Sequence, residues 1–184
     1  MKKLKVTIIG YGGMGSFHAK LIQANPEVEV HGIFDISESR QQAGEADGYS
    51  AYASLEEALN DACADTILIA TPNDVHKEIA VQALEAGKHV ICEKPVTLNS
   101  EELSEIMHTA EEQGRVFMVH QNRRWDSDFQ MVKDLYENRK IGEVFHIESR
   151  VQGANGIPGD WRHLKAHGGG LLLDWGVYFL DAVL

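Results

Sequence analysis

The sequence predicts an α/β fold: a doubly wound, mostly parallel Rossmann sheet, followed by the start of a second, incomplete α/β domain. Three observations carry this prediction. Short apolar runs alternate with longer helical patterns over the first 120 residues, which favours parallel strands joined by right-handed crossovers. These runs are continuously apolar, as in strands covered by helices on both faces. A glycine-rich turn also joins the first predicted strand to the first helix.

Apolar runs and capping residues place the elements of the first domain. Strands are predicted at residues 4–9, 28–34, 66–70, 89–93 and 116–120, with a short additional strand at 48–52. Helices are predicted at residues 16–24, 37–44, 54–60, 73–86 and 99–113. Ser54 and Glu57 have the spacing of a capping box, and Asn73 and Asn99 are expected to cap the last two helices.

The pattern changes after residue 120, which predicts a Rossmann domain at 1–120 and the beginning of a C-terminal domain at 121–184. A helix at 129–139, an alternating strand at 143–151, a Gly- and Asn-rich loop at 152–160 and a helix at 171–184 are predicted. One strand and two helices cannot close a core unaided.

Composition excludes several classes of function. The chain has 184 residues and a net charge of −11, with no Lys/Arg cluster, which argues against nucleic acid and against an anionic membrane surface as partners. No apolar run approaches the roughly 18 residues of a membrane span. Cys63 and Cys92 lack CxxC partners, as expected for a reducing compartment, so we predict a cytoplasmic protein.

A GxGxxG pattern at residues 10–15 predicts a dinucleotide site. Gly10 allows the tight turn, Gly12 lets the backbone approach a pyrophosphate, and Gly15 lets helix and strand pack closely. Gly13 and Met14 complete the loop, and the helix that follows offers unpaired N–H groups and a positive dipole end.

Asp35 favours NAD over NADP. It lies 20 residues after Gly15, at the end of the second predicted strand, where a carboxylate accepts hydrogen bonds from ribose hydroxyls and repels a 2′-phosphate. Arg40 could reach such a phosphate, so NADP stays the alternative.

Three further segments resemble the glucose–fructose oxidoreductase/inositol dehydrogenase (Gfo/Idh/MocA) family. They are Ala70-Thr71-Pro72-Asn73 with His76, Ala86-Gly87-Lys88-His89-Val90 leading into Cys92-Glu93-Lys94-Pro95, and Gly168-Gly169-Gly170 followed by Asp174, Gly176 and Tyr178. The resemblance implies an N-terminal Rossmann domain and a C-terminal α/β domain with a large open sheet, often used for homo-oligomers. It also implies redox chemistry on sugars, inositols or related polyols. Family members are roughly twice this length.

The resemblance identifies Lys94 as the catalytic lysine. Its ammonium can bind the substrate hydroxyl and stabilise developing alkoxide charge, and Glu93 and Pro95 would fix the turn that aims it. Without the motif, an exposed lysine at a strand end would be the simpler interpretation. The cofactor contacts implied on this side are Thr71, Pro72, Asn73, His76, Glu93 and Lys94.

Asp174 and Tyr178 are four residues apart, and therefore neighbours on one helix face. Many family members have His at the second position as general acid/base. A free phenol titrates near ~10, but a nearby ammonium would favour the phenolate. We hypothesise that Tyr178 transfers the proton; alternatively, it packs beside Val177 and Leu180 and Lys94 handles the proton alone.

Other candidate substrate contacts precede this helix. Arg123 could line the pocket or belong to a solvated basic turn. Trp161 offers a flat apolar wall for a sugar ring, with Arg162 and Lys165 beside it in sequence. No metal site is predicted, because glycines follow the His163/His167 pair and there is no HExxH motif.

The leading hypothesis is an NAD-dependent oxidoreductase acting on the CH–OH group of a sugar, inositol or related polyol. The alternatives within the resemblance are an NAD-dependent redox-type glycosidase and a non-catalytic dinucleotide-binding sensor or regulator. We expect residues 1–184 alone to bind cofactor better than they turn over substrate.

Overall fold

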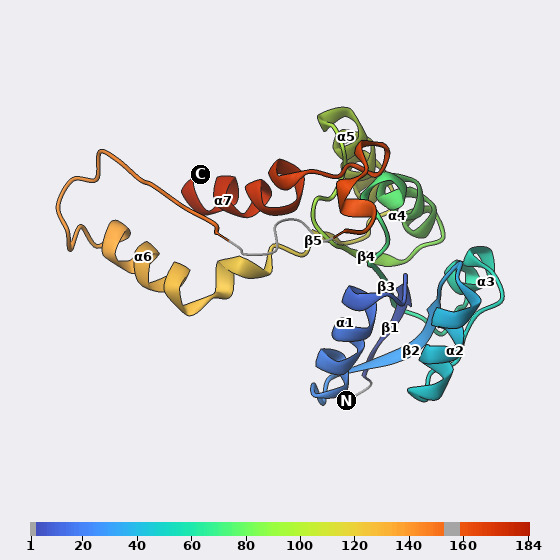
Figure 1. The fold of residues 1–184 in the computed structure, drawn as a ribbon. Coiled ribbons are helices and arrows are strands. Elements are labelled where there is room, and N and C mark those ends of the chain that lie inside the picture. The colour runs from blue at the N-terminus through green and yellow to red at the C-terminus, as the bar shows by residue number, and fades with distance from the viewer. Residues whose placement is uncertain (1–2, 153–158) are drawn as a thin grey trace. The chain divides into compact units, whose positions relative to one another are not determined.

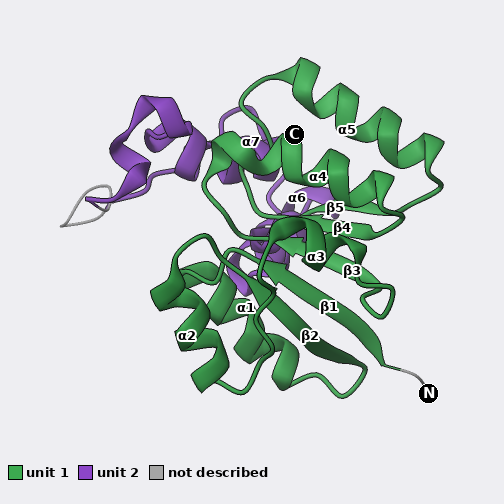
Figure 2. Ribbon diagram, turned by 90° about the vertical axis from the view of Figure 1, so that its right-hand side faces the viewer, with its two compact units in different colours: residues 1–119 green, residues 120–184 purple. Residues whose placement is uncertain are grey.

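A computed structural model describes residues 3–152 and 159–184 (Figure 1). The chain forms two compact units, residues 1–119 and 120–184 (Figure 2), and each is described by itself. Most of the loop predicted at 152–160 lies outside the described residues.

The first unit is built on a five-stranded parallel sheet, which confirms the predicted fold class. The strands are β1 (Leu4–Ile9), β2 (Val28–Phe34), β3 (Thr66–Ile69), β4 (His89–Cys92) and β5 (Phe117–Val119). Their order is β2-β1-β3-β4-β5, and every adjacent pair is parallel. The short strand predicted at 48–52 is reduced to one bridge, between Ile33 and Ala51.

Helices α1 (Gly13–Gln23), α2 (Glu38–Ala46), α3 (Leu55–Asn60), α4 (His76–Glu85) and α5 (Ser100–Glu112) connect the strands. The predicted caps of α3 and α5 are confirmed: Ser54 Oγ accepts from Glu57 N at 3.1 Å, and Asn99 Oδ1 accepts from Glu102 N at 2.9 Å. The prediction for Asn73 is wrong. A 3₁₀ turn, η1 (Asn73–Val75), takes up these residues, so α4 begins only at His76.

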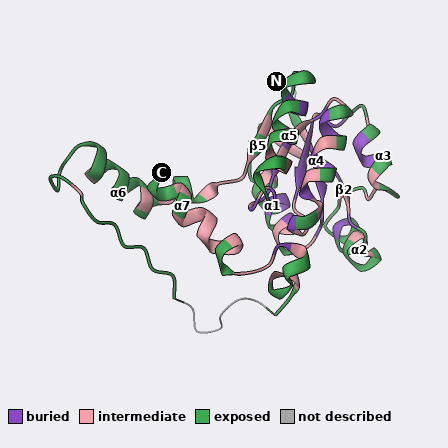
Figure 3. Ribbon diagram, turned by 90° about the horizontal axis from the view of Figure 1, so that it is seen from above, coloured by how far each residue is buried: buried purple, intermediate pink, exposed green. Residues whose placement is uncertain are grey.

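The core of this unit has two layers, because successive side chains of a strand point to opposite faces. Ile67 and Ile69 of β3 pack with residues of α3, α4 and α5. Leu68, between them, packs on the other face with Ala19 of α1 and Tyr11. Figure 3 shows the buried residues concentrated on these strands and on the sheet-facing sides of the helices. Both faces of the sheet are therefore buried under apolar side chains, as the continuous apolar runs predict.

The end of the sheet where α3 leads into β3 is held by the Asp61 carboxylate. It accepts hydrogen bonds from Tyr52 OH at 2.6 Å and Cys63 N at 2.7 Å, and it lies 3.0 Å from His31 Nε2. These bonds lower the pKa of Asp61 to about 2, with the Tyr52 bond the largest cause. Lys88 Nζ donates to the Asp61 carbonyl at 2.5 Å. This cluster ties the α3–β3 connection to β2 and to the start of β4.

The second unit is mainly helical in its described residues. It contains η2 (Asn122–Trp125), α6 (Ser127–Glu137), the 3₁₀ turns η3 (Trp161–His163) and η4 (Lys165–His167), the π-helical turn η5 (Leu172–Gly176) and α7 (Val177–Val183). The helices predicted at 129–139 and 171–184 are thus present, with shifted ends.

The prediction of a strand at residues 143–151 is wrong. Residues 143–152 have no regular structure, and Phe145 is 96% exposed. Alternation gives a segment two different faces, but a strand forms only against a partner edge. The described part of residues 120–184 has no strand, and its only buried residue is Gly168. These residues accordingly form no closed core.

Candidate dinucleotide site and substrate pocket

The glycine turn after β1 is shaped by close backbone contacts. Gly10 has φ +92°, and a Cβ there would lie 2.7 Å from the Ala70 carbonyl oxygen. A Cβ on Gly15 would lie 1.9 Å from the Gly10 carbonyl oxygen. The predicted roles of these two glycines, the tight turn and the close helix–strand packing, match this geometry.

Helix α1 begins directly at this turn. Its N-cap is Gly12, with no side-chain cap and no acidic residue in the first turn. The atoms nearest to a Cβ on Gly12 would be those of the Arg40 guanidinium, at 3.3 Å and beyond. Gly13 is exposed and Met14 is half-buried. The first N–H groups of α1 therefore suit a phosphate group.

Asp35, at the end of β2, faces the same turn. Its Oδ2 accepts from Tyr11 N and its Oδ1 accepts from Ser37 N, both at 2.8 Å, while the residue is only 4% exposed. Arg40 Nη1 lies 3.6 Å from Oδ2, and the guanidinium is half exposed. A buried carboxylate and a half-exposed guanidinium thus lie side by side at this turn.

The turn after β3 supplies a further sign of a ligand. Thr71 Oγ1 is buried and has no hydrogen-bond partner among the residues that the structure describes. Buried hydroxyls are normally paired. Pro72 is half-buried and Asn73 is buried beside it in the chain. Together with the glycine cradle, this unpaired hydroxyl fits a bound dinucleotide.

Lys94 follows β4, at the same carboxyl edge of the sheet. Its N–H donates to Glu93 Oε2 at 3.1 Å, and Glu93 Oε1 lies 2.6 Å from His18 Nε2. Glu93 N donates to the Ile69 carbonyl at 3.0 Å, which continues the pairing of β4 with β3. Lys94 itself is half-buried. Burial raises the pKa of the Cys92 thiol, as expected for an inert cysteine.

His76 joins two of these turns. Its ring is fully buried, with Nδ1 3.0 Å from the Pro95 carbonyl oxygen and Nε2 3.0 Å from the Thr71 carbonyl oxygen. Burial, the largest cause, lowers the pKa of the ring, although both carbonyls act to raise it. In this structure His76 positions the turns after β3 and β4; a direct cofactor contact stays a prediction.

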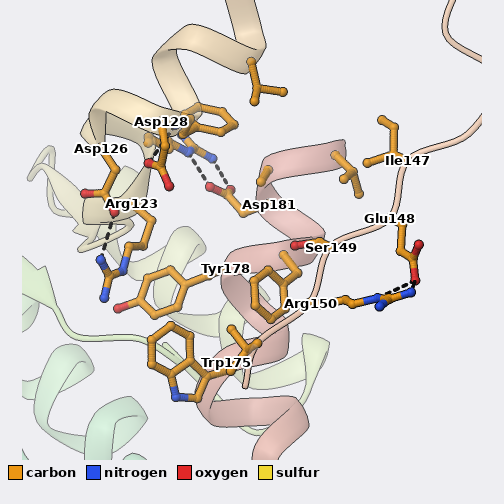
Figure 4. A pocket seen from close by; sticks show the side chains of 17 residues that line it. Arg123, Asp126, Asp128, Ile147, Glu148, Ser149, Arg150, Trp175, Tyr178 and Asp181 are labelled. Atoms are coloured by element: carbon orange, nitrogen blue, oxygen red, sulfur yellow. Dashed lines mark hydrogen bonds and ion pairs between the residues drawn. The ribbon is translucent and has the colours of Figure 1, made fainter. Parts of the chain in front are cut away.

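The second unit contains its own pocket, with a volume of about 460 Å³. The Arg123 guanidinium lies 5.6 Å from the ring centre of Tyr178 and 5.5 Å from that of Trp175. The two rings meet edge to face at 6.0 Å, and Figure 4 shows the three side chains together. Arg123 also donates to Asp126 at 2.8 Å, which raises the pKa of the guanidinium. An aromatic wall beside a cation suits a polyhydroxylated ring.

A glycine turn arranges the other predicted substrate residues. A Cβ on Gly169 would lie 2.3 Å from the Arg162 carbonyl oxygen, so this position requires glycine. Arg162 Nε lies 4.0 Å from Asp174 Oδ1, and its guanidinium lies 4.6 Å from the Trp161 ring centre. Lys165 is exposed. The structure therefore brings Trp161, Arg162 and Asp174 together and leaves Lys165 at the surface.

Two residues near these sites were not singled out from the sequence. His18 lies one helical turn beyond Gly15, a spacing that has meaning only once α1 is known to pack beside the end of β4. Trp175 lies one turn before Tyr178, so helical periodicity could have identified it. Lys94 belongs to the first unit and Asp174 and Tyr178 to the second, so their convergence on one substrate stays a prediction.

Comparison with known proteins places this geometry in a family. The family model described as "Oxidoreductase family, NAD-binding Rossmann fold" (GFO_IDH_MocA) matches residues 4–121, and the "GFO/IDH/MocA C-terminal domain" model matches residues 129–184. The chain belongs to this family of oxidoreductases with an NAD-binding Rossmann fold.

Individual relatives agree with this assignment. The chain is 59% identical to an NAD-binding protein from Listeria innocua, with a TM-score of 0.96, over 99% of this chain and 54% of that structure. It is 36% identical to the uncharacterized oxidoreductase YdgJ of Escherichia coli, over 98% of this chain and 53% of that protein. It is 31% identical to scyllo-inositol 2-dehydrogenase (NADP⁺) IolW of Bacillus subtilis, over 98% of this chain and 51% of that protein.

The chain thus spans about half the length of the relatives it matches. Among the described residues, no helix has the length and apolar character needed to cross a membrane.

The lowered pKa of His76 predicts a pH-dependent stability. Below pH ~6.5 the unfolded chain binds a proton at this histidine more readily than the folded protein does, so the free energy of unfolding falls as the pH drops. The slope from this one group is at most about 1.4 kcal/mol per pH unit. H76Q, which cannot titrate, should flatten the dependence of the urea-unfolding free energy on pH below pH ~6.5.

His108 provides the matched control, because its side chain is 72% exposed on α5. H108Q should keep the wild-type slope. An H76Q profile parallel to that of the wild type would contradict the assignment.

Proposed function

We propose that the full-length protein is an NAD-dependent oxidoreductase that moves a hydride between a nicotinamide cofactor and the CH–OH group of a sugar, inositol or related polyol. The observation that carries this proposal is the Lys94 turn. A lysine follows β4 at the carboxyl edge of the sheet, the same edge at which the glycine turn follows β1 and Asp35 follows β2. Open α/β sheets bind their ligands at this edge. The relative IolW of Bacillus subtilis, named a scyllo-inositol 2-dehydrogenase, supports the substrate class.

In this proposal each group of the chain has a defined task. A nicotinamide cofactor held here would supply the hydride chemistry. The first N–H groups of α1 would hold its diphosphate, and Asp35 would hold the adenosine ribose. The Lys94 ammonium donates a hydrogen bond to the substrate oxygen and stabilises its negative charge as the C–H bond breaks.

The proton of the substrate hydroxyl goes to Tyr178 in the proposed mechanism. Trp175 meets the phenol ring edge to face, and the Arg123 guanidinium lies over the ring, so both would orient the phenol. Asp174, Trp161 and Arg162 would contact other parts of the polyol. The alternative is that Lys94 transfers the proton alone and Tyr178 only packs.

We also propose NAD as the preferred cofactor, a cytoplasmic location and a homo-oligomeric full-length protein. Asp35 supports the first, since its buried carboxylate would repel a 2′-phosphate. The lack of a CxxC pattern around Cys63 and Cys92 supports the second. Apolar residues left exposed in the second unit, such as Phe145 and Leu172, support the third.

The catalytic role of Lys94 is tested in the full-length protein with a panel of myo-inositol, scyllo-inositol, D-glucose and D-xylose. Reduction of NAD is followed by the absorbance of the reduced nicotinamide. With the best substrate, K94A should lower kcat by at least about 100-fold, because the developing alkoxide loses its cation. The Kd for NAD should change by less than about threefold, because the diphosphate and ribose contacts remain.

Lys77 supplies the control, since it pairs with Glu105 on the helices α4 and α5. K77A should turn over like the wild type. Full activity of K94A would disprove the role of Lys94, and cofactor binding without turnover on any substrate would favour a sensor.

The role of Tyr178 predicts a change in the pH–rate profile. Y178F removes the proposed base, so kcat for polyol oxidation should fall by at least about 100-fold, and the decline of kcat/KM at acidic pH, where this base is protonated, should disappear. Y136F, on the exposed face of α6, serves as the matched control. An unchanged acidic limb in Y178F would assign the proton to Lys94 instead.

The preference for NAD depends on Asp35 and Arg40. D35S removes the carboxylate that repels a 2′-phosphate and leaves the neighbouring guanidinium available, so the ratio of NADP to NAD affinity should rise at least about tenfold. D35S/R40A should reverse most of that gain. Calorimetric titration with both cofactors measures the ratio, and an unchanged ratio in D35S would refute the assignment.

A further inference from the structure

A buried pair links the dinucleotide helix to the lysine turn. His18, on α1, and Glu93, after β4, are 4% and 6% exposed, and His18 Nε2 lies 2.6 Å from Glu93 Oε1. The two residues are 75 positions apart in the chain. Neither side chain has a direct task in the proposed hydride transfer.

The two carboxylate oxygens of Glu93 contact different parts of the chain. Oε1 faces His18 of α1, and Oε2 accepts the N–H of Lys94 at 3.1 Å. A single rigid carboxylate therefore joins the helix that follows the glycine turn to the backbone of the lysine. His76 of α4 holds the other side of this turn through the Pro95 carbonyl. The direction in which Lys94 leaves the turn is thus fixed from α1 and from α4.

Electrostatics gives the His18 contact a second consequence. A buried carboxylate is costly unless donors surround it. The His18 imidazole, 2.6 Å from Oε1, is one of the groups that hold this carboxylate. Loss of the imidazole would let the carboxylate move, and with it the Lys94 N–H that it accepts.

We propose that His18 is a positioning residue, which acts through the Glu93 carboxylate to hold Lys94 in its reactive orientation. This inference rests on the proposed function, in which Lys94 binds the substrate hydroxyl. Helix α1 would then position both groups. Its first residues follow the glycine turn, and His18, about one helical turn further along, holds the Lys94 turn through Glu93.

Kinetics of the full-length protein test the proposal. In H18N the shorter amide cannot reach Glu93, so kcat with the best polyol of the panel should fall about 10- to 100-fold, as for a misplaced reactive group. KM and the Kd for NAD should change by less than about threefold, because the phosphate turn remains intact. H18Q places an amide donor near the position of Nε2 and should recover most of kcat.

His31 provides a matched control, because it also pairs with a carboxylate, Asp61 at 3.0 Å, away from the lysine turn. H31Q should keep the wild-type kcat. If H18N does not fold, E93D replaces it: the shorter carboxylate cannot span both His18 and the Lys94 N–H, and the same loss of kcat is expected.

Amide hydrogen exchange at Lys94, measured by NMR without substrate, gives a second readout that does not depend on activity. The Lys94 N–H donates to Glu93, so its exchange should accelerate at least about tenfold in H18N and stay near the wild-type rate in H18Q and H31Q. Wild-type kcat and wild-type exchange in H18N would overturn the proposal.

The two readouts separate this inference from the proposed function. If the wild type oxidises no polyol of the panel, the proposed function fails, and the exchange rates still decide whether His18 holds the lysine turn. If the wild type is active and H18N matches it in both readouts, only the His18 inference fails.

Discussion

The first unit depends on one constraint: every strand of its sheet runs in the same direction. Parallel strands end at a common edge, so four successive turns, after β1, β2, β3 and β4, lie next to one another there. The apolar layers on both faces hold this edge in place. The phosphate turn, the ribose carboxylate and the lysine need no long loops to meet, because the strand direction already brings them together.

Much of this unit could be predicted from the sequence, because its signals are local. The continuous apolar runs defined the buried strands, and the side chains of Ser54 and Asn99 cap their helices as their spacing predicts. The error at Asn73 is also local, since a 3₁₀ turn replaced the first turn of the expected helix. His18 was missed for a different reason. Its partner Glu93 is distant in the chain, and only the packing of α1 against the strand ends makes them neighbours.

The second unit could be predicted less well, because its elements depend on partners beyond their own sequence. Residues 143–151 alternate as a strand does, yet they pair with no strand in the described part of the chain. The helix predicted around Tyr178 is present, since a helix satisfies its own backbone hydrogen bonds without a partner segment. The resemblance to known oxidoreductases predicts Asp174 and Tyr178 as site residues. The environment of Tyr178 between Trp175 and Arg123 emerged only from the structure.

The Asp61 cluster has a consequence for how this protein can vary. Its bonds to Tyr52, His31 and Cys63 hold the connection into β3, whereas the phosphate turn and Lys94 lie beyond the other ends of the strands. Substitutions that weaken this cluster would lower the fraction of folded chains, and the abundance of the protein in the cell would fall as a result. These residues can therefore be replaced by others that hold the connection equally well without altering the groups at the opposite edge of the sheet.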